Sequence, residues 1–230
     1  MKPLKDVFSI FFPNICVNCQ SRLLRNEQFL CIVCLNDLPV IIYNDTTKKM
    51  LQNIFFGKVP VQNVYSFLYF NKYGITKKLI HELKYKKEQN IGTFLGRRMC
   101  YEIEKLKLFS DVDCVLPVPL HKNKLRLRGY NQVDKFGVVL SNYLQVPYIL
   151  GVLKRVSRSE TQTLKQRFER FSNADSKFHI SDVDCLKNKH VLLIDDVITT
   201  GATLVSCCEE LLKVKNIKIS VCTMAYTENE

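Results

Sequence analysis

The spacing of apolar positions changes along the chain and predicts a mixed α/β protein. "VYSFLYF" alternates aromatic with smaller residues, and "DCVLPVPL" and "HVLLIDDV" are short apolar runs, which is typical of strands. "ITKKLIHELKYK" and "IGTFLGRRMCYEIEKL" instead repeat their apolar residues three or four positions apart, which predicts two amphipathic helices. A further short helical piece is expected around residues 48–55.

The order of elements in the second half predicts a parallel sheet. "DCVLPVPL" is followed by the helix "NQVDKFGVVLSNYLQ" and the strand "YILGVLKRV", and "HVLLIDDV" by the helix "ATLVSCCEELLKV" and the strand "IKISVCTMAY". Strands that alternate with helices form right-handed crossovers, which place the helices on the faces of a mostly parallel sheet. Ligands of such sheets bind beyond the carboxyl ends of the strands.

Four cysteines near the N-terminus are grouped in two pairs. Cys16 and Cys19 enclose two residues, eleven residues follow, and Cys31 and Cys34 again enclose two. This spacing predicts a tetrahedral zinc site, because each tight turn directs two thiolates at one ion. Two disulfides or chance spacing are the alternatives. Four thiolates leave no coordination position for a substrate, so we expect the zinc to be structural.

The cysteine pairs also indicate a division of the chain. A module of about 60 residues rarely buries enough apolar surface to fold alone, and a structural zinc ion contributes on the order of 10 kcal/mol. Pro60 lies in the polar connector that follows, so we expect a zinc-binding module at residues 1–62 and a larger domain at 63–230. Nucleic-acid binding by the module itself is not favoured. Arg22 and Arg25 are the only basic residues between the two cysteine pairs, and the acidic Glu27 lies close to them in the sequence.

Composition narrows the classes of partner. The chain has 230 residues, 47% of them hydrophobic, and a formal net charge of +12, which favours phosphorylated or polyanionic partners. No apolar run approaches the roughly 20 residues that span a bilayer, so we expect a cytoplasmic protein without membrane insertion. The six remaining cysteines lie scattered in apolar or mixed segments and are interpreted as small buried apolar residues.

The stretch "VLLIDDVITTGAT" is the main candidate for chemistry. If residues 191–194 form a buried strand, Asp195 and Asp196 emerge at its carboxyl end, and the next loop enters a helix near Leu204. The loop then presents backbone N–H groups and a helix N-terminus, which bind phosphate; its residues are Thr199, Thr200, Gly201, Ala202 and Thr203. The aspartates would repel a phosphate but suit ribose hydroxyls or Mg²⁺. A 5-phosphorylated ribose satisfies both halves of the motif.

This stretch resembles the 5-phosphoribosyl-1-pyrophosphate (PRPP) motif of type I phosphoribosyltransferases. Together with "PVPLHKNKLRLRGYNQ", "TQTLKQRFERFSN" and the four-cysteine module, it resembles the ComF family of competence proteins. The resemblance implies a type I phosphoribosyltransferase-like parallel sheet with flanking helices and a hood, plus an N-terminal zinc ribbon. It also implies PRPP and Mg²⁺ as ligands and a role in DNA uptake during natural competence.

The resemblance assigns roles to particular residues. Asp195 and Asp196 are the expected catalytic pair, which orients the ribose and contacts Mg²⁺ through PRPP. Pyrophosphate binding is expected at the turn and the cationic run that follow "PVP", namely Leu120, His121, Lys122, Arg126 and Arg128; a solvated basic loop is the alternative. The family's flexible loop falls between two strands, and its recurring residues are Arg155, Thr161, Gln162, Arg167, Arg170 and Asn173.

Three functions remain open at this point. The first is a phosphoribosyltransferase whose acceptor enters beneath a hood of residues 64–105, in which no acceptor signature is readable. The second is a non-catalytic module that binds PRPP or single-stranded DNA on its cationic face, alongside proteins of the DNA-uptake machinery. The third is a purine or pyrimidine salvage enzyme, against which the zinc module argues because salvage needs only the core domain.

Overall fold

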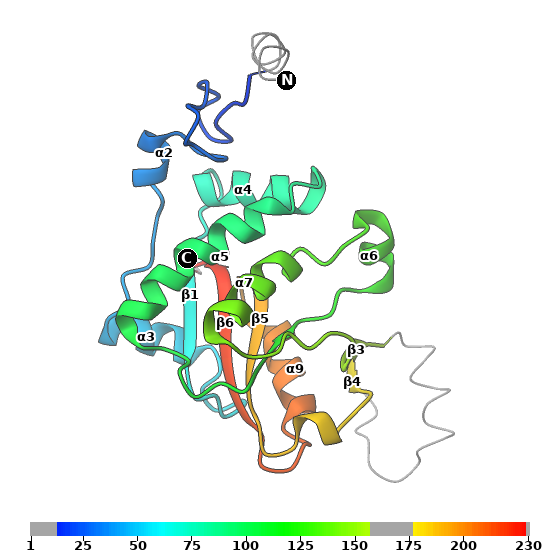
Figure 1. The fold of residues 1–230 in the computed structure, drawn as a ribbon. Helices are drawn as coiled ribbons and strands as arrows, with labels where there is room; N and C mark the ends of the chain where they lie inside the picture. The colour runs from blue at the N-terminus through cyan, green and yellow to red at the C-terminus, as the bar shows by residue number, and fades with distance from the viewer. Residues whose placement is uncertain (1–12, 157–176, 229–230) are drawn as a thin grey trace.

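A four-stranded parallel sheet forms the centre of the molecule (Figure 1). The computed structural model describes residues 13–156 and 177–228. The strand order is β1-β6-β5-β2, and each neighbouring pair is parallel, as expected. These strands are β1 (Val64–Tyr69), β2 (Cys114–Pro117), β5 (His190–Ile198) and β6 (Lys218–Tyr226). Their carboxyl ends therefore meet at one edge of the sheet, above which helix α4 passes in Figure 1.

Helices cover both faces of the sheet. One face carries α4 (Ile75–Tyr85), α5 (Asn90–Leu106) and α7 (Asp134–Leu144), and the other carries α3 (Asp45–Asn53) and α9 (Ala202–Leu211). Side chains of β5 alternate between the hydrophobic cores on the two faces of the sheet. Leu192 and Ile194 pack toward α4, α5 and α7, whereas Val191 and Leu193 pack toward α3 and α9. Helix α7 lies very close to the sheet, since a Cβ on Gly137 would overlap Tyr148 and Ile194.

Three short helical elements lie outside these two layers of helices. Helix α2 (Ile32–Asn36) lies in the four-cysteine module, and helix α6 (Lys122–Arg128) follows β2 and projects from the body in Figure 1. A single 3₁₀ turn, Asp184–Leu186, precedes β5.

The segment "YILGVLKRV" does not form the single strand that its apolar pattern predicts. Its first part pairs in parallel with β2 through Tyr148 and Val115. The chain then turns at Gly151, which has a positive φ of 76°. Its last part is β3 (Leu153–Arg155), which pairs antiparallel with β4 (Phe178–Ile180) outside the main sheet. The glycine therefore divides one apolar run between two sheets, because its left-handed conformation redirects the backbone.

The segment before β1 packs against the larger unit. The backbone N–H of Ile41 donates to the carbonyl of Phe67 at 2.8 Å, and the N–H of Tyr69 donates to the carbonyl of Pro39 at 2.8 Å. Leu51 of α3 and Phe55 are fully buried in the core on the α9 side of the sheet. The division at residue 62 stays a prediction, and this packing places residues 39–59 on the sheet rather than with the cysteine pairs.

None of the ten cysteines forms a disulfide, and five of the six scattered ones are buried, as interpreted from their apolar surroundings. Cys185 is the exception and is partly exposed. Within the described ranges, no helix has both the length and the apolar character needed to cross a membrane.

Candidate functional site

The turn from β5 into α9 carries the residues of the main motif. Strand β5 continues to Ile198, one residue beyond the predicted strand "HVLLIDDV", because Val197 and Ile198 still pair with β6. Helix α9 begins at Ala202, the first residue of the predicted helix "ATLVSCCEELLKV". Gly201 is its N-cap with a φ of 74°, and a Cβ at this position would overlap Ile54, the residue that follows α3. Both the left-handed backbone and the close approach of Ile54 therefore require glycine.

The predicted phosphate-binding loop has the geometry of an anion site. Thr199, Thr200, Ala202 and Thr203 are exposed, whereas Gly201 is buried beneath them. The first N–H groups of a helix have no carbonyl partner within the helix, so the start of α9 presents donors to solvent. The Ala202 N–H reaches only the Thr200 hydroxyl, at 3.4 Å. This turn can bind an anion through backbone donors and threonine hydroxyls.

Asp196 is buried and held by two side chains that the sequence did not single out. Lys84, near the end of α4, places its Nζ 2.8 Å from Oδ2 of Asp196. The Gln132 side-chain amide donates to the same oxygen at 2.5 Å. Lys84 follows the apolar stripe of its helix and Gln132 stands in "RGYNQ", but no spacing rule connects either with the motif. A resemblance to "RGYNQ" could have marked Gln132; nothing local marks Lys84.

The "RGYNQ" segment forms the wall around this carboxylate. Arg128 donates to Oε1 of Gln132 at 2.6 Å, and its guanidinium lies 5.3 Å from the ring centre of Tyr85. The hydroxyl of Tyr130 donates to the carbonyl of Leu83, the residue next to Lys84. Arg128, which was predicted to bind pyrophosphate, is thus committed in this structure to a side chain that orients Asp196.

Asp195 lies on the opposite face of β5 and has a different environment. Its Oδ1 accepts the backbone N–H of Asp196 at 2.8 Å. Burial and the neighbouring Asp196 carboxylate raise the pKa of Asp195 to about 8, although the charges of Lys84 and Arg155 oppose this shift. The two adjacent aspartates therefore differ: Asp196 is paired with a cation, and Asp195 favours its neutral form in the absence of a ligand.

The predicted pyrophosphate residues follow the neighbouring strand. Pro117 at the end of β2 is level with Ile194 of β5, so Leu120 leaves the same edge of the sheet. His121 caps α6 by accepting the Asn123 N–H at 3.2 Å, which sets Lys122 at the start of the helix. Lys122 and Arg126 are exposed.

The predicted flexible loop lies mostly outside the described residues. Thr161, Gln162, Arg167, Arg170 and Asn173 all fall there. Arg155 is described, and its guanidinium lies 5.5 Å from the ring centre of Phe178, across the β3-β4 pair.

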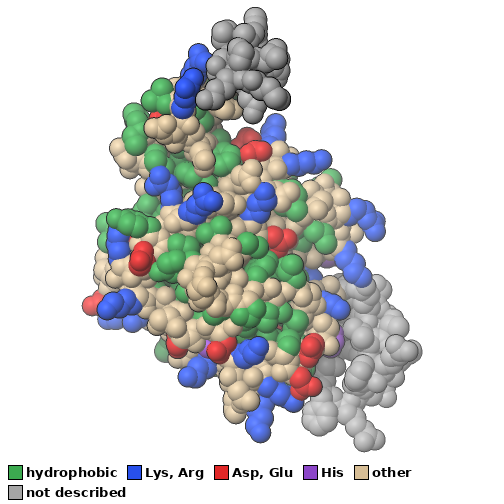
Figure 2. Space-filling view, in the orientation of Figure 1, with side chains coloured by type: hydrophobic (Ala, Val, Ile, Leu, Met, Phe, Trp, Pro, Cys, Tyr) green, Lys and Arg blue, Asp and Glu red, His purple; other side chains and the backbone are tan. Residues whose placement is uncertain are grey.

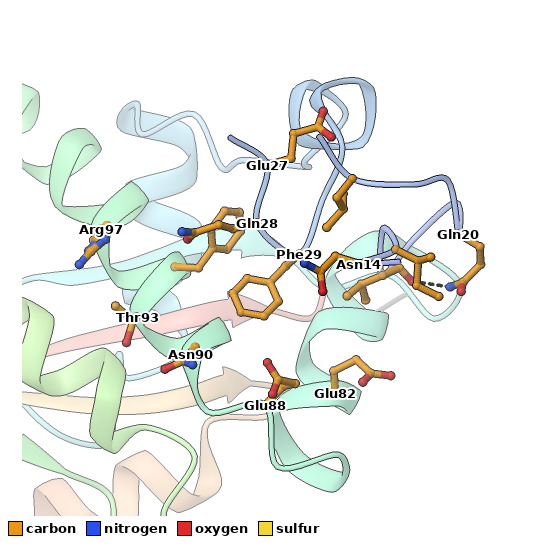
Figure 3. Close-up of a pocket in the computed structure, with 14 residues that line it drawn as sticks. Asn14, Gln20, Glu27, Gln28, Phe29, Glu82, Glu88, Asn90, Thr93 and Arg97 are labelled. Carbon is orange, nitrogen blue, oxygen red and sulfur yellow. Dashed lines mark hydrogen bonds between the residues drawn. The ribbon is translucent and has the colours of Figure 1, made fainter. Parts of the chain in front are cut away.

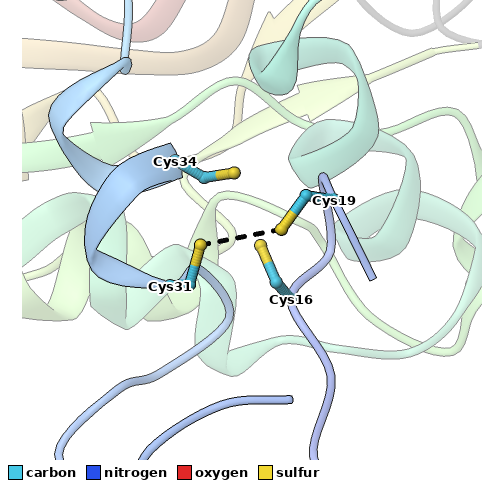
Figure 4. A group of neighbouring side chains, drawn as sticks. All are labelled: Cys16, Cys19, Cys31 and Cys34. Atoms are coloured by element: carbon cyan, nitrogen blue, oxygen red, sulfur yellow. Dashed lines mark hydrogen bonds between the residues drawn. The ribbon is translucent and has the colours of Figure 1, made fainter. Parts of the chain in front are cut away.

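The four N-terminal cysteines converge to form a group that can hold a metal ion (Figure 4). Their sulfur atoms all lie within 4.8 Å of one another. Sulfur atoms bound tetrahedrally to zinc are about 3.8 Å apart, given bonds of about 2.3 Å, so the group needs only a small contraction. Hydrogen bonds from Ser21 lower the pKa of Cys19 to about 6, which favours the thiolate that a metal requires.

Hydrogen bonds through Asn18 and Lys78 connect this group to helix α4. The Asn18 amide donates to Sγ of Cys34 at 3.2 Å. Lys78 of α4 in turn donates to the Asn18 backbone carbonyl at 2.8 Å and to its side-chain oxygen at 2.9 Å. Contacts of this kind fix the orientation of metal ligands. The four-cysteine module is therefore tied to the same helix that carries Lys84.

A cleft of about 570 Å³ separates the module from α4 and α5 (Figure 3). Phe29 of the module projects into it and packs edge-on against Phe94 of α5, with ring centres 5.7 Å apart. Glu82 and Glu88 lie at the α4 end, and Arg97 lies along α5. Figure 2 shows lysine and arginine side chains spread over the visible face with acidic ones between them, rather than gathered in one patch.

Comparisons with known proteins agree with this geometry. A family model described as a phosphoribosyl transferase domain matches residues 135–229. The chain is 31% identical over 130 residues to Competence protein F of Haemophilus influenzae, which covers 55% of this chain and 57% of that protein. It is 27% identical over 138 residues to DNA utilization protein YhgH of Escherichia coli (strain K12), covering 59% and 60% of the two chains. The match spans less than two thirds of either relative.

Among solved structures, the chain is similar to a purine phosphoribosyltransferase from Pyrococcus horikoshii. The TM-score is 0.37 and the identity 21%, over 58% of this chain and 74% of that chain.

The raised pKa of Asp195 predicts a pH-dependent effect of the Asp195→Asn substitution on stability. The unfolded carboxyl ionises near pH 3.8 and the folded one only near pH 8, so the free energy of unfolding of the wild type falls as the pH rises between these values. Asparagine stays neutral and still accepts the Asp196 N–H. Without ligand, we expect the variant to melt at a higher temperature than the wild type, by a difference that increases between about pH 5 and about pH 8.5.

Thermal melts at both pH values test this prediction, with Asp196→Asn as the control. That substitution removes a charge paired with Lys84 and should lower the melting temperature at both pH values. A difference between Asp195→Asn and wild type that does not change with pH would contradict the shifted pKa.

Removal of metal should loosen only the part of the module that lacks other support. A strong zinc chelator is expected to increase amide hydrogen exchange across residues 14–38, because the converging cysteines are the main link within this segment. Residues 45–59 should keep their protection, since Leu51 and Phe55 are buried in the sheet core. A chelator selective for Ca²⁺ and Mg²⁺ is the control. Loss of protection through α3 would show that the metal supports the sheet as well.

Proposed function

This chain belongs to the ComF family and has a type I phosphoribosyltransferase fold, and from this premise we propose that it binds PRPP with Mg²⁺ at the carboxyl edge of β5 and β2. One observation carries the proposal. An anion-binding turn at the start of α9 directly follows two aspartates, one of which, Asp196, is fixed by Lys84 and Gln132. A terminal phosphate and a neighbouring ribose diol require this combination of donors and acceptors.

Each part of PRPP is assigned to one part of the edge. The 5-phosphate binds the turn of residues 199–203 and the start of α9. Asp195 and Asp196 accept hydrogen bonds from the ribose hydroxyls. The pyrophosphate lies toward the β2 side, where the proposed contacts are the backbone at Leu120, together with His121, Lys122 and Arg126. Arg128 acts at this edge through Gln132, and Arg155 approaches Asp195 from the β3 side.

The same arrangement supports transfer of the phosphoribosyl group. Transfer breaks the bond between ribose C1 and the pyrophosphate, so negative charge grows on the leaving group and positive charge on the ring. Mg²⁺ bound with PRPP balances charge on the pyrophosphate. Basic side chains next to α6 stabilise the leaving group, and the aspartates orient the ribose. The acceptor enters on the side of α4 and α5, which form the hood.

We propose zinc as the metal of the four-cysteine group. Four sulfur ligands in two closely spaced pairs favour zinc over Mg²⁺ or Ca²⁺, which prefer oxygen. The closed set of four ligands gives the ion a structural role. A cytoplasmic location fits a chain whose ten cysteines form no disulfide and whose proposed ligand is a metabolite. The names of the relatives support a role in DNA uptake, with proteins of that machinery as partners.

A second candidate function rests on two exposed aromatic residues at the two ends of α4. Tyr73 is 83% exposed and lies between two lysines, with Nζ of Lys72 and Lys77 at 5.8 Å and 5.7 Å from its ring centre. Tyr85, 60% exposed, lies beside Arg128. Exposed aromatics flanked by cations can stack bases and neutralise phosphates of a single strand. This surface supports binding of single-stranded DNA, either beside the PRPP site or in place of catalysis.

The PRPP proposal predicts a measurable loss of affinity on removing either aspartate. By calorimetry with Mg²⁺ present, Asp195→Asn and Asp196→Asn should each weaken PRPP binding by about 10- to 100-fold, because each replaces a carboxyl group that accepts from a ribose hydroxyl. Asp37→Asn, which neutralises an exposed aspartate far from this edge, should bind as the wild type does. Wild-type protein that gives no heat with PRPP and Mg²⁺ would refute the proposal. Release of pyrophosphate with one of a panel of bases and amines would establish catalysis.

The DNA proposal predicts salt-dependent binding that requires an aromatic ring at position 73. Tyr73→Ala should weaken binding of an oligothymidine several-fold, whereas Tyr73→Phe should retain it, because stacking needs the ring and not the hydroxyl. Fluorescence anisotropy at rising salt measures both effects. Equal affinities for the two variants would exclude stacking at this residue. Competition by PRPP would show that the two ligands share a surface.

A further inference from the structure

Lys84 and Gln132 leave one oxygen of Asp196 open. Both donors bind Oδ2, at 2.8 Å and 2.5 Å, and the described part of the chain supplies no donor to Oδ1. The side chains of Lys84 and Asp196 are only 20% and 8% exposed, so the ion pair is largely shielded from water. A carboxylate held by one oxygen in this way has a fixed rotamer and a fixed direction for its second oxygen.

The donors are themselves held in place. Arg128 donates to Oε1 of Gln132, so the Gln132 amide must turn its NH₂ group toward Asp196. The hydroxyl of Tyr130 binds the carbonyl of Leu83 and thereby fixes the turn of α4 that carries Lys84. Helix α4 is further seated by Leu79 and Leu83, which are fully buried. Neither donor can follow Asp196 to another position without breaking these contacts.

We propose that Lys84 is a positioning residue of the PRPP site, which holds Oδ2 of Asp196 so that Oδ1 faces the ribose hydroxyls. This inference rests on the proposed function. The lysine acts through Asp196 and does not contact the pyrophosphate. Its cationic Nζ lies 2.8 Å from Asp196, so the negative charge of this acceptor has a partner within the site. The hood helix therefore contributes to ribose recognition as well as to the space for the acceptor.

The proposal predicts different effects of a Lys84 substitution on the affinities for PRPP, ribose 5-phosphate and inorganic pyrophosphate. PRPP and ribose 5-phosphate both contain the diol that Asp196 recognises, whereas inorganic pyrophosphate lacks it. A residue that orients Asp196 must affect the first two ligands alike and leave the third unchanged. A residue that binds the leaving group directly must affect PRPP and pyrophosphate instead. A residue needed only for folding must affect all three.

The experiment measures the affinities of these three ligands by calorimetry for the wild type, Lys84→Met, Lys84→Arg and Lys86→Met. Lys84→Met should weaken PRPP and ribose 5-phosphate by a similar factor, about tenfold or more, because it leaves a buried carboxylate with one donor. Pyrophosphate should bind with unchanged affinity. Lys84→Arg should restore most of the loss, since it keeps a cation in reach. Lys86→Met removes the same charge from the exposed end of α4 and should have no effect.

A double-mutant cycle tests whether Lys84 acts through Asp196. In an Asp196→Asn background, Lys84→Met should weaken PRPP binding by less than twofold, because the oxygen that it positions is no longer a charged acceptor. Additive losses would overturn the proposal, and so would weakened pyrophosphate binding or wild-type affinity for all three ligands in Lys84→Met. If the wild type binds PRPP but any of these contradicting results is found, the role of Lys84 is refuted and the proposed PRPP site is not. A wild type that binds none of the three ligands would overturn the proposed function as well.

Discussion

The buried negative charge of Asp196 constrains how the helices above the sheet are arranged. An ionised carboxylate that leaves water without a partner costs several kcal/mol, and a buried pair stays favourable only with good geometry and further hydrogen bonds. Lys84 supplies the opposite charge and Gln132 the additional donor, from two elements far apart in the chain. The end of α4 and the segment that leads into α7 must therefore meet at the carboxyl end of β5.

Helix α4 contacts both the four-cysteine module and the proposed PRPP site at the carboxyl edge of the sheet. Lys78 binds Asn18, whose amide contacts Cys34, and Lys84, on the same helix, binds Asp196. Between them, Leu79 and Leu83 bury the opposite side of the helix in the core. The polar positions of one short amphipathic helix thus join the four-cysteine module to the edge of the sheet, while its apolar positions hold it on α5 and the sheet.

The two adjacent aspartates illustrate how one residue type acquires two states. Successive side chains of a strand point to opposite faces, so Asp196 meets the hood side and Asp195 the α9 side. On the hood side a lysine and an amide stabilise the charged form. On the α9 side, burial and the neighbouring charge favour the neutral form, so binding of a ligand with hydroxyl donors or a cation must shift this balance.

The sequence by itself determined the features that depend on neighbours in the chain: the alternation of strands and helices, the loop that starts α9, and the paired cysteines. It predicted one strand from "YILGVLKRV", because an apolar run does not report where a glycine turns the backbone. Only the tertiary structure revealed Lys84, Gln132 and the packing of residues 39–59 on the sheet. These contacts join segments distant in sequence, and a polar side chain on a helix has no local signal that tells a buried partner from solvent.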